Sequence, residues 1–228
     1  MRNRLIAYSA LLYVVSIGIA SAQQPSYQNL RFNEDWSTVP EGESGDLFDP
    51  IKNIEISDSI QLTLGGSARY RYESWDDFGF GAMNDDAFSL FRFYLHSDWR
   101  IGDSWRVFVE GRATTVNNRD LPGGKRAALD IDEYDLWNTF VEGQFPGSNL
   151  DVTVRVGRQE LQYGAQRLIS PLDWANNRRI FDGGLVRIKS KSGWMLDAFV
   201  TAPVMIDPDE FTWNDTDHTR LFSALYYS

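Results

Sequence analysis

The stretch SIQLTLGGSARYRYESW at residues 59–75 alternates strictly between two kinds of side chain. Its apolar and small residues share one face: Ile60, Leu62, Leu64, Gly66, Ala68, Tyr70 and Tyr72. The other face carries Gln61, Thr63, Gly65, Ser67, Arg69, Arg71 and Glu73. A period of two sustained over 14 positions is typical of a β-strand whose two faces meet different environments. We therefore expect long strands with one apolar and one polar face.

The same alternation recurs along the rest of the chain. Its apolar positions are Phe91, Phe93, Leu95, Trp99, Trp105, Val107, Val109, Ala113, Val152, Val154, Val156, Val186, Ile188, Trp194, Leu196, Ala198 and Val200. The pattern around 133–145 is ambiguous, and there we predict an apolar face of Trp137, Thr139, Val141 and Phe145. Residues 218–228 begin a further strand, so the sequence predicts about eight.

The connections between these strands alternate in length. Short ones fall at 102–104, 146–149 and 190–193, and long ones at 76–86, 117–130, 157–183 and 204–217. Outer-membrane barrels have short periplasmic turns and long external loops in this order, whereas nothing forces a soluble β-sandwich to do so. Strands of 9–11 tilted residues are long enough to cross the hydrocarbon layer. We predict an all-β protein, an antiparallel transmembrane β-barrel in contact with outer-membrane lipid and lipopolysaccharide.

The first 22 residues have the pattern of a secretory signal peptide. A basic start, MRNR, precedes the apolar run LIAYSALLYVVSIGIA and the small-residue site Ala20-Ser21-Ala22. The run is short for a spanning helix, although a retained anchor is the alternative. Residues 23–55 are polar and rich in proline and glycine, which predicts an irregular leader. The barrel domain is then expected at 56–228.

Charge and cysteine content narrow the partners and the compartment. Without residues 1–22 the chain has 20 basic and 32 acidic residues, a formal charge of −12, which argues against nucleic acid as a partner. It has no cysteine, so a secreted form without disulfides must be stabilised by burial, metal or a membrane.

If the apolar faces meet lipid, the polar faces line a lumen. Eight basic side chains fall on the polar face: Arg69, Arg71, Arg92, Arg106, Arg112, Arg155, Arg187 and Lys189. Five acidic ones share it: Glu73, Asp98, Glu110, Glu142 and Asp197. Such a wall concentrates anions, can hold carboxylates bidentately, and suits anion passage. The alternative is that the arginines pair with neighbouring acids and only satisfy a polar interior.

Metal and catalytic chemistry have little support. The acidic stretches DIDEYD and DPDEFTWNDTD lack the glycine and spacing of a calcium-binding loop. His96 and His218 are the chain's two histidines, and a pairing of His96 with Ser89 or Ser97 has no motif behind it. The close acids at 131–135 are too common a pattern to indicate a glycosidase. We predict no enzyme activity, no cofactor and no metal.

Several stretches resemble the alginate-export family of outer-membrane barrels. RFNEDWS (31–37) and LGGSARYRYES (64–74) are similar to the family's opening, and FRFYLHSDWRIGDSWRVFVEG (91–111) resembles its first periplasmic turn region. The most specific stretch is VGRQELQYGAQRLISPLDWANNRRIFDG (156–183). It is similar to the family's ordered signature of GRQE, YG, RL, DW and R-x-FDG.

The resemblance covers about 31–228. It implies a monomeric 18-stranded barrel with an electropositive constriction that passes an anionic polysaccharide such as alginate. By motif position it implies roles for five residues: Arg158, Arg167, Arg179, Asp173 and Asp182. On this basis we hypothesise that the connection 157–183 turns inward and helps build the constriction, its arginines held by the two aspartates. The alternative is that these residues only brace the loop against the wall.

The sequence stops at LFSALYYS, inside the eighth predicted strand. Bacterial barrels usually end on a complete strand closing with an aromatic residue, so we expect an N-terminal fragment of a longer protein. Its structure should then be an open, curved sheet with an unpaired edge, rather than a small closed barrel.

The leading functional hypothesis is an outer-membrane channel for an anionic polysaccharide or smaller anions, by diffusion through an arginine-lined lumen. One alternative is a general or substrate-specific porin for small solutes. The other is a secreted carbohydrate-binding β protein, which would be soluble without detergent.

Overall fold

The computed structural model describes residues 27–37, 47–80, 84–120, 126–208 and 213–228. The predicted signal peptide at 1–22 lies outside these residues, as does much of the predicted leader. Helical structure in the described ranges is limited to four short elements: η1 (Arg31–Asn33), η2 (Asp49–Ile51), η3 (Phe78–Phe80) and α1 (Ala127–Asp130). Among the described residues, none of the helices is long and apolar enough to pass through a membrane.

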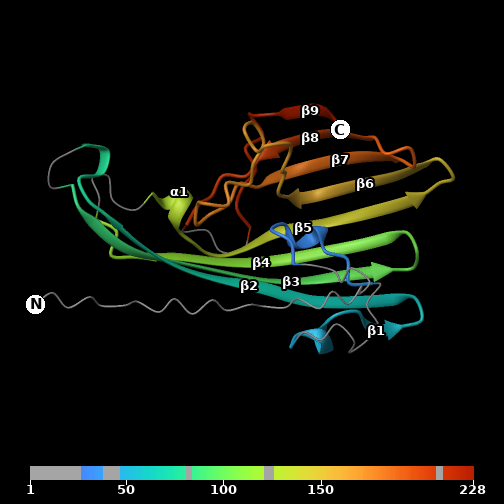
Figure 1. The fold of residues 1–228 in the computed structure, drawn as a ribbon, viewed down its shortest axis with the longest axis horizontal. Coiled ribbons are helices and arrows are strands. Elements are labelled where there is room, and N and C mark those ends of the chain that lie inside the picture. The colour runs from blue at the N-terminus through green and yellow to red at the C-terminus, as the bar shows by residue number, and fades with distance from the viewer. Residues whose placement is uncertain (1–26, 38–46, 81–83, 121–125, 209–212) are drawn as a thin grey trace, which may run out of the picture.

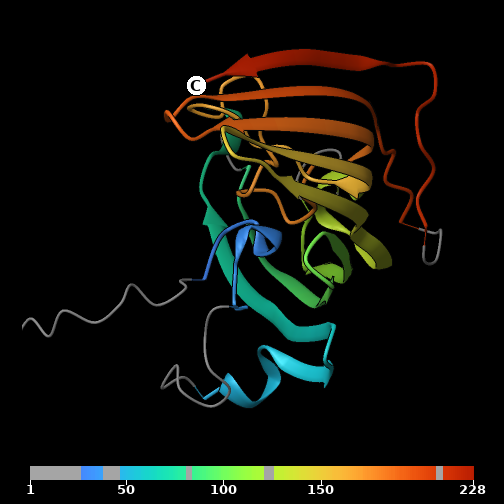
Figure 2. The ribbon, with the colours of Figure 1, turned by 90° about the vertical axis from the view of Figure 1, so that its right-hand side faces the viewer.

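Within the described ranges, nine strands form one antiparallel sheet in sequence order. They are β1 (Ile54–Ser57), β2 (Ile60–Trp75), β3 (Asp86–Ile101), β4 (Trp105–Asn117), β5 (Asp132–Pro146), β6 (Leu150–Gln159), β7 (Phe181–Ser190), β8 (Met195–Pro203) and β9 (Phe222–Tyr227). The sheet is curved and open: in the described part of the chain, its edge strands β1 and β9 do not pair with each other (Figures 1 and 2). The all-β class and the open, curved sheet are confirmed. The strand beyond the predicted eight is β1, whose four residues are too few to show a period.

The alternation of connection lengths is also confirmed. Short turns join β3 to β4, β5 to β6 and β7 to β8 at one end of the sheet, while the long connections lie at the other end (Figure 1). The connection between β6 and β7, residues 160–180, contains no helix or strand. We call it the β6–β7 loop.

The sheet has the opposite polarity to that of a water-soluble protein. In β3 the side chains of Phe91, Phe93 and Leu95 are 42%, 38% and 58% exposed, whereas Arg92, Tyr94 and His96, which alternate with them, are buried. The buried polar face is the concave one, because residues 27–37 and the β6–β7 loop lie within the curve of the sheet (Figure 2). Polar side chains of this face, among them Arg92 and Arg106, contact those two segments. Apolar side chains therefore cover the convex face, as a lipid-facing wall requires.

One face assignment in β5 is wrong. Trp137 was expected outside with Val141 and Phe145, but its side chain is completely buried. Val109 pairs with Thr139, whereas Gly111, two residues on, pairs with Leu136, three residues back. The extra residue in β5 is a β-bulge, which breaks the period of two and turns the indole of Trp137 inward.

Buried apolar residues gather where inward segments meet the concave face. Residue Phe32 joins Phe108 and Phe140, and Ile180 of the β6–β7 loop joins Tyr94 and Trp137. The interior is therefore a set of small apolar contacts between polar groups, and these contacts fix the inward segments on the sheet.

Candidate functional site

The β6–β7 loop crosses the concave face and reaches the opposite side of the curve. Arg69 of β2 donates from Nη1 to the carbonyl of Asp173 at 2.7 Å and from Nη2 to that of Ala175 at 2.9 Å. Arg92 of β3 donates to the Ala175 carbonyl at 3.1 Å, and Arg71 donates to the Trp174 carbonyl. Since β2 and β3 are three to four strands away from β6 in the sheet, the loop spans the concavity.

Two consecutive asparagines fix this loop to the sheet. The buried Asn176 amide donates to three backbone carbonyls, those of Phe91 at 3.1 Å, Thr115 at 3.1 Å and Asp130 at 2.9 Å. Asn177 donates to the carbonyl of Ile131 at 2.7 Å. Neither asparagine belongs to a motif or a periodic pattern in the sequence. The two adjacent asparagines are themselves the sequence feature that could have indicated this contact, because an amide side chain can hydrogen-bond to backbone carbonyl groups.

The two aspartates named by the resemblance both hold arginines. Asp182 accepts from Nε and Nη2 of Arg158, at 2.9 Å each, in a bidentate pair. Asp173 accepts from Nη2 of Arg92 at 3.1 Å, and its Oδ1 lies 3.6 Å from Nε of Arg178. Asp173 is therefore paired with Arg178, which the sequence reasoning did not name, and with a strand arginine.

The other two arginines named by the resemblance are placed differently. Arg167 and Arg179 are exposed, and their side chains form no ion pair or hydrogen bond with any residue in the described ranges. They are not held by Asp173 or Asp182, contrary to the hypothesis. Their guanidinium groups are instead available to solvent or to a ligand.

Most arginines on the concave face are paired with acids. The pairs with their N–O distances are Arg71–Glu73 (2.6 Å), Arg92–Asp173 (3.1 Å), Arg106–Asp98 (2.7 Å), Arg155–Glu142 (2.5 Å), Arg158–Asp182 (2.9 Å), Arg187–Asp197 (2.6 Å) and the close pair Arg112–Asp132. Arg69 donates to carbonyls. Because a paired charge contributes little field at a distance, the positive charge available to an anion is smaller than the count of arginines indicates.

The connection between β8 and β9 also turns inward. Its buried Asn214 donates to Asp132 and Asp135 at 2.9 Å each. The guanidinium of Arg158 lies 3.9 Å from the ring centroid of Trp213 and donates to the Asn214 carbonyl. Arg158 therefore fixes two connections at once, through Asp182 and through this loop.

Two groups on the β6–β7 loop have shifted pKa values. Burial would lower the pKa of Arg178, but Glu160, Tyr94, Asp173 and Glu110 together outweigh burial, and the pKa is raised. Burial raises the pKa of Tyr163, as does the 2.8 Å hydrogen bond that its hydroxyl donates to Asp197. Arg178 therefore stays charged and Tyr163 neutral at physiological pH, which keeps both contacts intact.

Residues weighed for metal or catalytic roles have other contacts. Asp130 of the DIDEYD stretch accepts from Arg119 at 2.8 Å. His96 stacks on Phe108, and its Nδ1 lies 4.0 Å from a carboxylate oxygen of Glu110. In the described ranges, no three histidine, cysteine, aspartate or glutamate residues gather as metal ligands would.

An antiparallel sheet with an apolar convex face and a charged concave face is the wall of an outer-membrane protein. The comparisons give the family: residues 60–228 match the family model described as alginate export, and the chain belongs to that family of outer-membrane transport channels. No curated protein and no solved structure matches the chain.

Proposed function

We propose that this chain forms part of the wall of an outer-membrane channel through which an anionic polysaccharide, or a smaller anion, diffuses passively. The predicted signal peptide would deliver it to the outer membrane. There the convex face would contact lipid and lipopolysaccharide, and the channel would work as a monomer. No cofactor and no chemical step are needed for such transport.

The observation that carries the proposal is the placement of arginine on the concave face. Arginine side chains from five strands, β2, β3, β4, β6 and β7, lie on this face, while the convex face is apolar. A polar face enclosed by a lipid-facing wall is where water and solute pass in a barrel. Guanidinium groups on that path favour carboxylate-bearing solutes.

The β6–β7 loop supplies the narrow part of this path. It occupies space within the curve, and its contacts with the sheet leave Arg167 and Arg179 exposed. Because these two guanidinium groups have no acid partner among the described residues, we assign them the direct contact with the passing anion. The paired arginines then hold the wall and the loop in shape.

Single-channel recording of the full gene product in planar bilayers tests this function. The proposal predicts an anion-selective reversal potential in a salt gradient and a current that an oligouronate blocks. A cation-selective current, or an anion current that no oligouronate affects, would reject polysaccharide transport.

A second candidate, a porin for small solutes, is favoured by one observation. Eight concave-face arginines, with Arg100 and its partner Asp35 included, have acidic partners, which weakens the field that would select a polyanion. The same recordings separate the two, because a general porin gives a large current with little ion selectivity and no block by oligouronates.

A further inference from the structure

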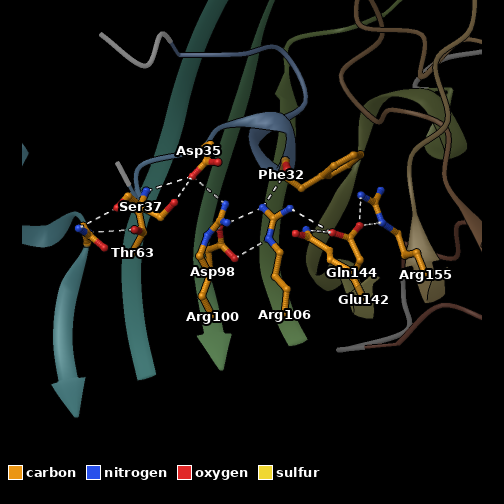
Figure 3. A network of polar contacts seen from close by, with 11 residues as sticks. Phe32, Asp35, Ser37, Thr63, Asp98, Arg100, Arg106, Glu142, Gln144 and Arg155 are labelled. Atoms are coloured by element: carbon orange, nitrogen blue, oxygen red, sulfur yellow. Dashed lines mark hydrogen bonds and ion pairs between the residues drawn. The ribbon is translucent and has the colours of Figure 1, made fainter. Parts of the chain in front are cut away.

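We propose that residues 27–37 occupy a binding site for an acidic sugar unit on the concave face, and that the polymer displaces them when it binds. This inference rests on the proposed function and extends it to a particular site. The segment lies on the concave face near the ends of β3 and β4 (Figures 2 and 3). By composition it belongs to the irregular leader predicted at 23–55.

Three arginines from separate elements converge on the segment. Nη2 of Arg106, on β4, donates to the carbonyl of Phe32 at 2.8 Å. Nη2 of Arg100, on β3, lies 3.1 Å from the carboxylate of Asp35 (Figure 3). Arg178, on the β6–β7 loop, donates to the carbonyl of Asn29 at 3.1 Å. The segment therefore occupies donors that a carboxylate or hydroxyl of a sugar could use.

A cluster of three aromatic rings lies beside these donors. The Phe32 ring packs edge-on against Phe108 at 6.0 Å and Phe140 at 5.4 Å between centroids, and it is 4% exposed. Phe108 and Phe140 stack on each other at 5.4 Å. The guanidinium of Arg155 lies 4.6 Å from the Phe32 ring. If Phe32 leaves, an apolar surface edged by arginine is exposed.

The segment presents the same three groups as an acidic sugar: an apolar ring face, an acceptor oxygen and a carboxylate. Phe32 supplies the ring and the carbonyl, and Asp35 supplies the carboxylate. An acidic sugar offers a C–H face that packs on aromatic rings and a carboxylate that arginine holds. The site should therefore prefer uronate units over neutral sugars.

Side chains hold the segment on the sheet, among them Lys52, whose Nζ lies 3.3 Å from the centroid of the Trp36 ring, but no strand pairing does. The segment contains no strand, and the backbone–backbone hydrogen bonds of residues 29–37 stay within it, from Asn33 to Leu30 and from Glu34 to Arg31. The arginines beneath keep their own supports, since Arg106 remains paired with Asp98 at 2.7 Å and Arg155 with Glu142 at 2.5 Å.

Arg100 is the exception among these supports. Its other acidic neighbour, Asp98, is 4.0 Å away and already bound to Arg106. Departure of Asp35 therefore leaves Arg100 without a close acid, and a uronate carboxylate can replace the one it lost.

Block of the full-length channel by an oligouronate of defined length tests the inference. If the segment occupies the site about nine-tenths of the time, the apparent affinity of the channel for the oligouronate is about tenfold weaker than that of the empty site. Asp35→Asn and Phe32→Ala should each strengthen the block by several-fold up to that limit. Asn33→Ala is the matched control, because Asn33 is exposed and lies between the changed residues; it should leave the block unchanged.

Addition of the segment as a peptide, YQNLRFNEDWS, provides an independent measurement. A channel lacking residues 27–37 should lose current and bind oligouronate more weakly when the peptide is added. Both effects should reverse when the peptide is washed out. A peptide with Asp35→Asn should compete less well. If the deletion prevents assembly, Asp35→Asn in the intact chain still decides, since this carboxylate is 57% exposed and its loss is tolerable for folding.

The outcomes separate this inference from the proposed function. A wild-type channel that oligouronates block, with Phe32→Ala and Asp35→Asn blocked equally well, overturns the displaceable segment and keeps the proposed function. A channel that is neither anion-selective nor blocked in any form overturns the proposed function, and this inference with it.

Discussion

Arginine side chains on the concave face fall into two groups by their contacts. Arg158 is completely buried between Asp182 and the β8–β9 connection, whereas Arg167 and Arg179 are exposed. The first kind fixes the structure and the second is free to meet solute. Substitution of the buried arginine should therefore lower stability, and substitution of the exposed arginines should lower anion selectivity.

Arg158→Gln should cost about 3–5 kcal/mol of unfolding free energy, because removing one member of a buried ion pair leaves the other carboxylate uncompensated. Replacement of Arg167 and Arg179 by glutamine should change stability by less than about 1 kcal/mol, since exposed sites contribute little. The double variant should, however, lower anion selectivity. Urea unfolding in micelles and reversal potentials in bilayers measure the two effects. Unchanged selectivity in the double variant would contradict the role assigned to these residues.

Asn176→Ala should destabilise the protein by about 2–3 kcal/mol, because it removes a buried donor whose two hydrogens are shared among three backbone carbonyls. Thermal unfolding in detergent measures the loss. Gln162→Ala on the same loop is the control, since Gln162 is exposed. An equal effect of both substitutions would mean that the asparagine contacts do not hold the loop.

Single residues show where prediction from the sequence stops. The period of two predicts that Arg92, Arg106 and Arg112 point inward, and all three side chains are buried. Their partners do not follow, because an acid 81 residues away, Asp173, can come to Arg92 only when the loop folds back. Trp137 was misplaced because one bulged residue reverses the faces of the strand beyond it.

At the scale of elements, the β6–β7 loop distinguishes a constriction from a brace. Replacing residues 162–179 by a short glycine–serine linker should increase the conductance and reduce anion selectivity, because the loop and its exposed arginines leave the path. Planar-bilayer recordings check this result. A lower melting temperature with the same conductance and selectivity would instead mean that the loop only braces the wall.

Segment 27–37 should respond to acid through Asp35. Burial alone would raise the pKa of this carboxyl, but the hydrogen bonds from Ser37 and the charges of Arg100 and Arg106 together outweigh burial and lower the pKa below its usual range. Because the pKa of Asp35 is lower in the seated segment than in the free segment, the contact of Asp35 with Arg100 stabilises the seated segment at pH values above the pKa of the free carboxyl. This stabilisation is lost as the pH falls through the lowered pKa.

The seated segment should therefore be insensitive to pH between neutrality and about pH 5 and should loosen below about pH 4. A fluorophore on Asn33→Cys, in a chain with no other cysteine, reports the change. Asp35→Asn should remove the step near this pH. A step that persists in that variant would place the titrating group elsewhere.

The sequence predicted elements better than it predicted their inward packing. Long strands repeat their alternation many times, so β2, β3 and β4 were identified with their faces correct. β1 has four residues and gave no period. Residues 27–37 were assigned to an irregular leader because they have no regular structure beyond η1, although Leu30, Phe32 and Trp36 in a polar stretch were a signal of burial.

At the scale of the whole molecule, the central claim is that the convex face meets lipid and the concave face meets water. Val186 and Lys189 of β7 permit a direct comparison, because both are exposed and their side chains point to opposite faces of one strand. Family membership and the polarity of the sheet agree on this arrangement, and channel function depends on it.

The decisive measurement is thiol accessibility in the assembled full-length protein in lipid vesicles, with a single cysteine at each of these two positions. We expect Lys189→Cys to react rapidly with a charged, water-soluble thiol reagent, and we expect the reaction to change the channel current. Val186→Cys should resist that reagent, and a fluorophore placed there should be quenched by a lipid-borne nitroxide. Rapid aqueous labelling of Val186→Cys together with protection of Lys189→Cys would contradict the account.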